Sequence, residues 1–204
     1  DLNKFSKFAS ENNLGKFLEK YPGLRIMKQD LWECLVSFIC SSASNIKKIQ
    51  LNLNLLSQSF GKPIKFEDKI FYSFPEPGAL KDLETIKQAK TGFRANYIYN
   101  LNEIVDDNFL RNLKIVKYTK AKELLCELPG VGEKIADCVL LFSLSHKQAF
   151  PVDVWIKRAM EDLYFSGEKT SIKKIRDFAT TEFGDHSGYV QQYLYHYSRN
   201  VGGD

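Results

Sequence analysis

Apolar side chains recur every three or four residues along most of the chain, and this spacing is typical of amphipathic α-helices. In "QDLWECLVSFICSS", Asp30 is a candidate N-cap, and Glu33 stands three residues later at the capping-box position. The apolar positions that follow helical spacing there are Leu31, Cys34, Leu35, Phe38 and Ile39. A second helix is predicted from Ser44 to a stop at Gly61.

The pattern changes in "KPIKFEDKIFYSFP", residues 62–75, which alternates, contains β-forming residues and has Glu67 and Asp68 at its centre. This stretch predicts a small β-hairpin. Helical patterns resume afterwards in the segments 76–89, 92–105, 107–115, 119–128, 151–165, 171–184 and 187–200. The whole pattern predicts an all-α protein of roughly ten helices with one hairpin, divided into two lobes.

Composition narrows the class of protein without fixing it. The chain has 204 residues, 44% of them hydrophobic, and a net charge of +4, which permits nucleic-acid binding but does not require it. No run approaches the roughly 18 apolar residues that cross a membrane. The first residues also lack the apolar stretch of a signal peptide. We therefore expect an intracellular protein without a membrane partner, cytoplasmic and close to the nucleoid if its source is a prokaryote.

Cysteines and histidines give no metal motif. None of Cys34, Cys40, Cys126 and Cys138 has the two-residue gap of a zinc or redox pair, so we expect buried free thiols. The three histidines are scattered, and the carboxylates show no ligand spacing. These observations argue against a metal-dependent nuclease.

The stretch "LCELPGVGEKIADCVLLF" joins two helical segments through a Pro-Gly-Val-Gly turn. Gly130 and Gly132 allow a sharp reversal and a close approach of backbone N–H groups to a partner. The start of a helix binds phosphate, so such a hairpin can hold a DNA backbone without reading bases. The carbonyls of Cys126, Leu128 and Val131 could hold Na⁺ or K⁺ beneath that phosphate. An ordinary helical hairpin with a glycine turn is the alternative.

Lys134 lies in the first turn of the second segment, where the positive end of the helix disfavours an ammonium. We expect a neutral amine, which is the form that a nucleophile needs. A solvated surface lysine is the alternative. In "FPVDVW", Asp153 can cap the helix that begins at Val154. A plain N-cap without a chemical role is the alternative. A carboxylate near a neutral lysine suits chemistry at a carbon that becomes cationic.

The hairpin, the Gly/Pro-rich loop and the downstream aspartate together resemble the helix–hairpin–helix DNA glycosylases. Within that superfamily the chain is similar to the 8-oxoguanine DNA glycosylase family. The matching stretches, in the order of the family, are "LWECLVSFICSS", "GFRANY", "LPGVGEKIADC", "FPVDVW" and "GYVQQYLY". The resemblance implies one lobe of residues 1–48 with 134–204, which carries the lesion pocket and the catalytic aspartate. It implies a second lobe of residues 49–133, a helical barrel that ends in the hairpin.

The resemblance implies a bifunctional enzyme that flips a damaged purine out of the duplex. Lys134 would attack C1′ of the deoxyribose, expel the base and form a Schiff base, after which β-elimination nicks the strand. Asp153 would support the oxocarbenium-like charge, and Cys138 would lie against the base pocket.

Further roles follow residue by residue from the resemblance. Phe93 stands where the family has an aromatic wedge, with core packing as the alternative, and Arg94 where it contacts the orphaned base. Gln191 matches a glutamine that binds the Watson–Crick edge of the lesion. Tyr195 matches an aromatic residue that stacks on the lesion.

Several positions depart from the family pattern. Ala43 replaces an asparagine before Asn45, and Lys48 replaces an arginine, so we expect weaker discrimination of the base opposite the lesion. Trp155 stands where many members have a histidine that helps with the phosphate. The N-terminal β-rich domain of many members has no counterpart among these residues.

We expect a monomer that acts on double-stranded DNA containing 8-oxoguanine and requires no cofactor. Two alternatives remain open. One is a monofunctional glycosylase for alkylated or mismatched bases, in which Asp153 activates water. The other is a DNA-binding module without enzymatic activity.

Overall fold

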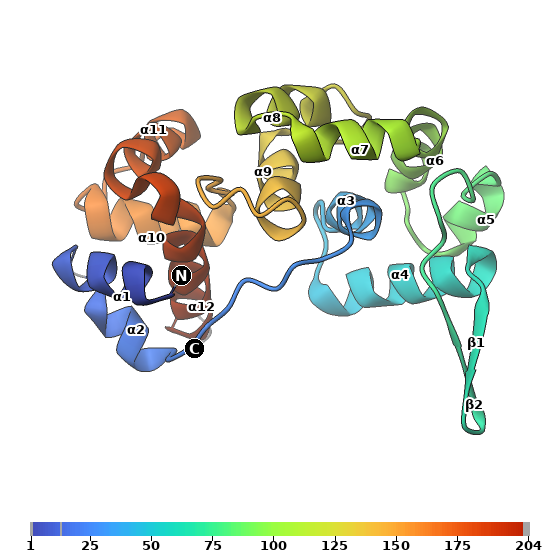
Figure 1. Cartoon of the computed structure of the whole chain (residues 1–204), viewed down its shortest axis with the longest axis horizontal. Coiled ribbons are helices and arrows are strands. Elements are labelled where there is room, and N and C mark those ends of the chain that lie inside the picture. The colour runs from blue at the N-terminus through green and yellow to red at the C-terminus, as the bar shows by residue number, and fades with distance from the viewer. Residues whose placement is uncertain (1, 13, 202–204) are drawn as a thin grey trace. The chain divides into compact units, whose positions relative to one another are not determined.

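The computed structural model describes residues 2–12 and 14–201, which form helices and one small sheet (Figure 1). The all-helical fold with a hairpin is confirmed. The chain divides into unit 1, Asp1–Lys28 with Leu140–Asp204, and unit 2, Gln29–Val139. The predicted lobes had different bounds, because residues 29–48 and 134–139 belong to unit 2.

Unit 2 contains α3 (Leu31–Cys40), α4 (Ile46–Phe60), α5 (Leu83–Gln88), α6 (Arg94–Ile104), α7 (Asp107–Ile115) and α8 (Tyr118–Cys126). Helix α9 (Glu133–Phe142) begins in unit 2, and the boundary between the units falls inside it. The predicted cap of α3 is confirmed, since the Asp30 side chain accepts the Glu33 N–H at 3.0 Å. Local capping therefore fixes the start of the helix that packs on α4 and α6.

The predicted hairpin consists of the antiparallel strands β1 (Pro63–Phe66) and β2 (Lys69–Tyr72). Glu67 turns the chain with a positive φ of 51°. The Ser73 N–H donates to the Lys62 carbonyl at 3.0 Å and closes the base. All eight strand residues are exposed, and the hairpin extends away from the helices of its own unit (Figure 1).

The helix predicted over 76–89 is shorter than expected, because only Leu83–Gln88 is helical. Gly78 adopts a positive φ of 81°, which turns the chain. The Leu80 N–H donates to the Asn102 side chain at 3.0 Å instead of to a helical carbonyl. Residues 76–82 therefore form a loop that Asn102 of α6 holds.

Unit 1 contains α1 (Leu2–Glu11), α2 (Gly15–Lys20), α10 (Val154–Tyr164), α11 (Ile172–Phe183), the 3₁₀ turn η1 (Gly184–His186) and α12 (Ser187–Val201). The sequence did not predict α1 and α2. They bury Phe5 and Phe17 in an aromatic core, where the Phe5 ring stacks on Tyr193 at 5.3 Å. The first two helices are thus held by distant residues of α12.

Two further expectations can be compared with the fold. None of the four cysteines is in a disulfide among the described residues, and Cys34, Cys40 and Cys138 are buried while Cys126 is half-buried. Over residues 2–12 and 14–201, no helix has the length and apolar character needed to span a bilayer.

Candidate active site

The hairpin between α8 and α9 is a tight turn that needs one of its two glycines. Gly130 has a positive φ of 76°, and a Cβ there would lie 2.7 Å from Cγ of Tyr97. Gly132 is exposed, and a Cβ there would meet nothing within 4 Å. The Val131 N–H donates to the Leu128 carbonyl at 3.1 Å. The turn therefore presents the exposed start of α9 while Tyr97 of α6 packs against its inner side.

Lys134 is the second residue of α9 and is half-buried. Its amine lies 5.2 Å from the centroid of the Phe38 ring of α3, within cation–π distance. Within the described part of unit 2, this amine forms no salt bridge. The side chain is therefore neither neutralised by a carboxylate of its own unit nor fully solvated. Cys138 is buried one helical turn further along α9.

Phe93 is an exposed aromatic residue at the start of α6, with 59% of its surface accessible. Its ring makes an edge contact with Tyr97, with centroids 6.4 Å apart. Tyr97 in turn packs against Gly130, so these contacts link Phe93 to the hairpin. Core packing, the alternative reading of Phe93, is therefore excluded, and its role as a wedge stays a prediction.

Arg94 is only 2% exposed, and its guanidinium group binds backbone carbonyls. Its Nε donates to the Ser42 carbonyl at 2.8 Å, and Nη2 donates to both Ser42 and Ala43. Its Nη1 donates to the Thr91 carbonyl at 3.1 Å. Arg94 thus braces the loop after α3, and its predicted contact with the orphaned base stays a prediction.

That loop carries the residues expected to choose the opposite base. Ala43 adopts a positive φ of 46°, and the exposed Asn45 caps α4 by accepting the Lys48 N–H at 2.9 Å. Lys48 is also exposed. The side-chain oxygen of Asn45 is therefore engaged within the protein as the cap of α4.

Two predicted residues of unit 1, Asp153 and Gln191, are connected through the segment before α10. Asp153 is half-buried, and its Oδ1 accepts the Ile156 N–H at 2.8 Å, which confirms the predicted cap of α10. Gln191 of α12 is 4% exposed and donates to the Pro151 carbonyl at 3.1 Å. Gln191 thus ties α12 to the segment that carries Asp153.

The other two predicted residues of unit 1, Trp155 and Tyr195, are half-buried. Tyr195 follows Gln191 by four residues on α12, which places both on one face. The guanidinium carbon of Arg158 lies 5.8 Å from the Trp155 ring. Lys134 belongs to unit 2 and Asp153 to unit 1, so the pairing of amine and carboxylate stays a prediction.

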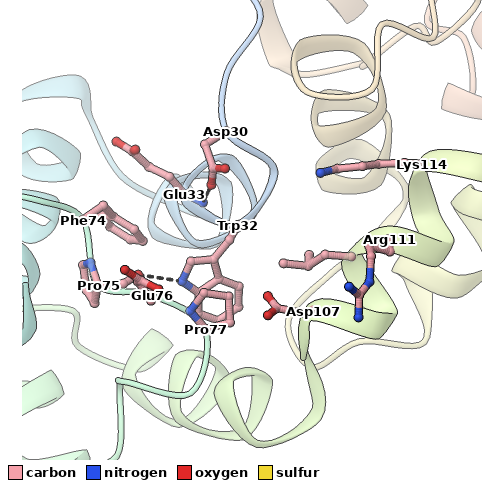
Figure 2. Close-up of a pocket in the computed structure, with 11 residues that line it drawn as sticks. Asp30, Trp32, Glu33, Phe74, Pro75, Glu76, Pro77, Asp107, Arg111 and Lys114 are labelled. Carbon is pink, nitrogen blue, oxygen red and sulfur yellow. Dashed lines mark hydrogen bonds between the residues drawn. The ribbon is translucent and has the colours of Figure 1, made fainter.

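A cavity of about 480 Å³ in unit 2 contains none of these residues. The start of α3, residues 74–77 and helix α7 line it (Figure 2). On one wall, the Trp32 indole N–H donates to the Pro75 carbonyl at 2.9 Å, while Arg111 and Lys114 stand on the α7 wall. Among the described residues, no group of three or more His, Cys, Asp and Glu side chains is placed to hold a metal ion.

Comparisons with known proteins decide the family. No protein-family profile matches the chain. The chain is 31% identical to a probable N-glycosylase/DNA lyase of Methanothermobacter thermautotrophicus over 99% of its own length and 72% of the relative. The 8-oxoguanine glycosylase/lyase of Clostridium acetobutylicum, solved with DNA containing cytosine opposite 8-oxoguanine, superposes with a TM-score of 0.92 and 35% identity. A structure of MBOgg1 with a low-affinity DNA ligand also gives 0.92, at 38% identity. Both superpositions cover 99% of this chain and 71% of the other.

The chain belongs to the 8-oxoguanine glycosylase/lyase family.

This membership confirms the resemblance carried by the hairpin and "FPVDVW" stretches. Sequence reasoning missed three residues that surround Lys134 or the hairpin in this family member, namely Phe38, Tyr97 and Asp137. Phe38 was counted only as an apolar helix position. The one available signal for Asp137 was a single acidic residue inside the apolar run "IADCVLLF".

Proposed function

We propose that this chain removes 8-oxoguanine from duplex DNA and then cleaves the abasic strand, with Lys134 as the nucleophile. One observation carries the assignment of the nucleophile. Lys134 stands in the first turn of α9, directly after the Gly130 turn. A phosphate held by the start of α9 would bring the neighbouring sugar to this amine. We also propose that the activity takes place inside the cell, because its proposed substrate is duplex DNA.

The chemistry proceeds in balanced steps. The Lys134 lone pair bonds to C1′, and the glycosidic bond breaks with its electron pair on the departing base, which takes up a proton. Asp153 offsets the positive charge that develops on the sugar. Loss of the amine proton and opening of the ring give a Schiff base. Removal of a C2′ proton then expels the 3′ phosphate, and water releases Lys134.

Pocket and wedge roles complete the proposal. Cys138, Gln191 and Tyr195 would contact the flipped base, and Phe93 would fill the gap that it leaves. The loop of Asn45 and Lys48 would approach the opposite base, where Ala43 supplies no side-chain hydrogen bond. We therefore propose weaker selection of the opposite base than an asparagine there would give.

A monovalent cation could support the hairpin through the carbonyls of Cys126, Leu128 and Val131. These residues fit Na⁺ or K⁺ in donor type, because they offer neutral backbone oxygens at the end of α8 and in the turn that follows it. The Leu128 carbonyl accepts one hydrogen bond, from Val131, and a carbonyl oxygen has two lone pairs. Bound there, the cation would add positive charge beneath a phosphate.

Borohydride trapping on duplex DNA containing 8-oxoguanine tests the proposed function. We expect a covalent complex with the unmodified chain, none with Lys134→Gln, and an undiminished yield with Lys120→Gln. Lys120 is a matched control, because it lies on the exposed side of α8 in an ion pair with Glu123.

The same assay separates the alternatives. Base release without trapping would replace the proposal by a monofunctional glycosylase. DNA binding without base release would replace it by a binding module.

Asp153→Asn should lower the trapping rate by roughly 10²-fold or more, since it removes charge stabilisation at the sugar.

A further inference from the structure

Asp137 is a buried carboxylate on the helix that carries Lys134. It is 1% exposed, although it follows Lys134 by only three residues on α9. The Tyr118 hydroxyl donates to its Oδ1 at 2.8 Å. The Lys122 amine lies 2.9 Å from Oδ1 and 3.0 Å from Oδ2. One carboxylate of α9 is therefore held by two side chains of α8.

These contacts join the two arms of the hairpin. Tyr118 and Lys122 are four residues apart on α8, so both project from the same face of that helix. The Lys122 side chain is itself only 20% exposed. Burial raises the pKa of Asp137, whereas Lys122 and Tyr118 act in the opposite direction. The two α8 partners thus favour the charged form of the carboxyl group against the effect of burial.

A buried ion pair of this kind is poor evidence for stability, because desolvation offsets much of the attraction. The pair has a larger effect on geometry, because it restrains the rotation of α9 about its axis. Three residues along a helix place Asp137 and Lys134 about 60° apart around the axis, so a rotation of α9 moves both. Side-chain tips lie roughly 5–6 Å from the axis, and a rotation of about 10° therefore shifts an amine by ~1 Å. A displacement of ~1 Å can cost on the order of 10²-fold in rate.

We propose that Asp137, held by Lys122 and Tyr118, is a positioning residue that fixes the rotation of α9 and so aims Lys134 at the sugar carbon. The inference rests on the proposed function, since it assigns Lys134 the role of nucleophile. It goes beyond that function because neither Asp137 nor its α8 partners touch the reacting atoms in the proposed chemistry.

The test compares Asp137→Asn and Lys122→Met with the matched control Lys120→Met. All three variants keep the approximate size of the side chain. Lys120→Met removes the same charge from the same helix, at an exposed pair with Glu123. Single-turnover borohydride trapping is measured at saturating enzyme, and binding is measured with a duplex that carries a tetrahydrofuran abasic analogue. The analogue cannot form a Schiff base, so it reports affinity alone.

We expect Asp137→Asn and Lys122→Met to slow trapping by about 10- to 100-fold, while affinity for the analogue stays within roughly threefold. Lys120→Met should match the unmodified chain in both measurements, and Lys122→Arg should recover most of the rate because arginine can also pair with the carboxylate. A trapping rate for Lys122→Met equal to that of Lys120→Met would overturn the inference. A parallel loss of affinity and rate would also overturn it, because that result indicates a general loss of structure.

Hydrogen exchange keeps the inference testable if Asp137→Asn does not fold or if the chain does not trap DNA. We expect the amides of residues 132–136 to exchange faster in Lys122→Met than in Lys120→Met. Equal exchange rates in the two variants would refute the positioning role of Asp137. Faster exchange in Lys122→Met, together with no trapping by the unmodified chain, would refute only the proposed function.

Discussion

Gly130 is the position in the turn between α8 and α9 where a side chain is least tolerated. Replacing it with alanine places a Cβ 2.7 Å from Cγ and 2.9 Å from Cβ of Tyr97. Rotation of the tyrosine ring cannot relieve the second contact, because that atom is attached directly to the α6 backbone. The positive φ of 76° adds a separate penalty for any residue with a Cβ.

The two costs can be added. The left-handed conformation costs about 1–2 kcal/mol. Overpacking against a fixed neighbour costs about 1–3 kcal/mol. Their sum is about 2–5 kcal/mol in the free energy of unfolding, and 1 kcal/mol corresponds to ~2–4 °C for a chain of this size. We therefore expect Gly130→Ala to lower the melting temperature by roughly 10 °C.

Gly132→Ala is the matched control, because it adds the same methyl group two residues away in open space. Thermal melts followed by circular dichroism should show Gly132→Ala within ~3 °C of the unmodified chain. Combining Gly130→Ala with Tyr97→Ala should recover part of the loss, since the clash disappears while the backbone penalty remains. Equal melting temperatures for the two glycine variants would refute the packing argument.

Three other predictions concern groups away from the hairpin. Arg94→Lys should destabilise the protein by about 3 kcal/mol in urea titrations, because buried carbonyls lose their donors; a change below ~1 kcal/mol would contradict the bracing role. Glu161 accepts hydrogen bonds from Lys157 and the Thr170 N–H, and these contacts lower its pKa. Its stabilisation is therefore present at neutral pH and lost as the pH falls through the lowered pKa, so Glu161→Gln should be less stable at pH 7 and approach the unmodified chain in strong acid; a difference that does not change between neutral pH and acid would contradict this assignment. Burial raises the pKa of Cys40 to about 12, so iodoacetamide at pH 8 should label the half-buried Cys126 first; early labelling of Cys40 would show that its helix opens.

Features set by local sequence could be predicted. The caps Asp30 and Asp153 and the Glu67–Asp68 turn each depend on residues within a few positions, and all three are found where expected. Helices α1 and α2 could not be predicted in the same way. They are held by aromatic contacts with α12, more than 170 residues away in the chain, such as Phe5 with Tyr193 and Phe17 with Tyr197. Directly after α2, the Tyr21 hydroxyl also donates to the His196 carbonyl.

In the candidate site, too, some features depend on neighbouring residues and others on contacts between distant parts of the chain. The positions of Lys134 in the first turn of α9 and of Gly130 in the turn follow from the sequence between the two helices. The environment of Arg94 does not, because its acceptors Ser42 and Ala43 lie 52 and 51 residues before it. The family resemblance suggested a base contact, which stays a prediction, whereas tertiary packing gives this guanidinium a set of backbone carbonyls. The Asp137–Lys122 pair was missed for the same reason, since only the fold brings α8 and α9 face to face.

The β-hairpin offers a place to attach a reporter. All residues of its two strands are exposed, and the turn at Glu67 and Asp68 lies at the end of the hairpin away from α4. A peptide tag or a dye-labelled loop spliced into that turn would be displayed without cutting any helix. Such a handle would allow single molecules of the enzyme to be followed on DNA without altering any residue of the candidate site.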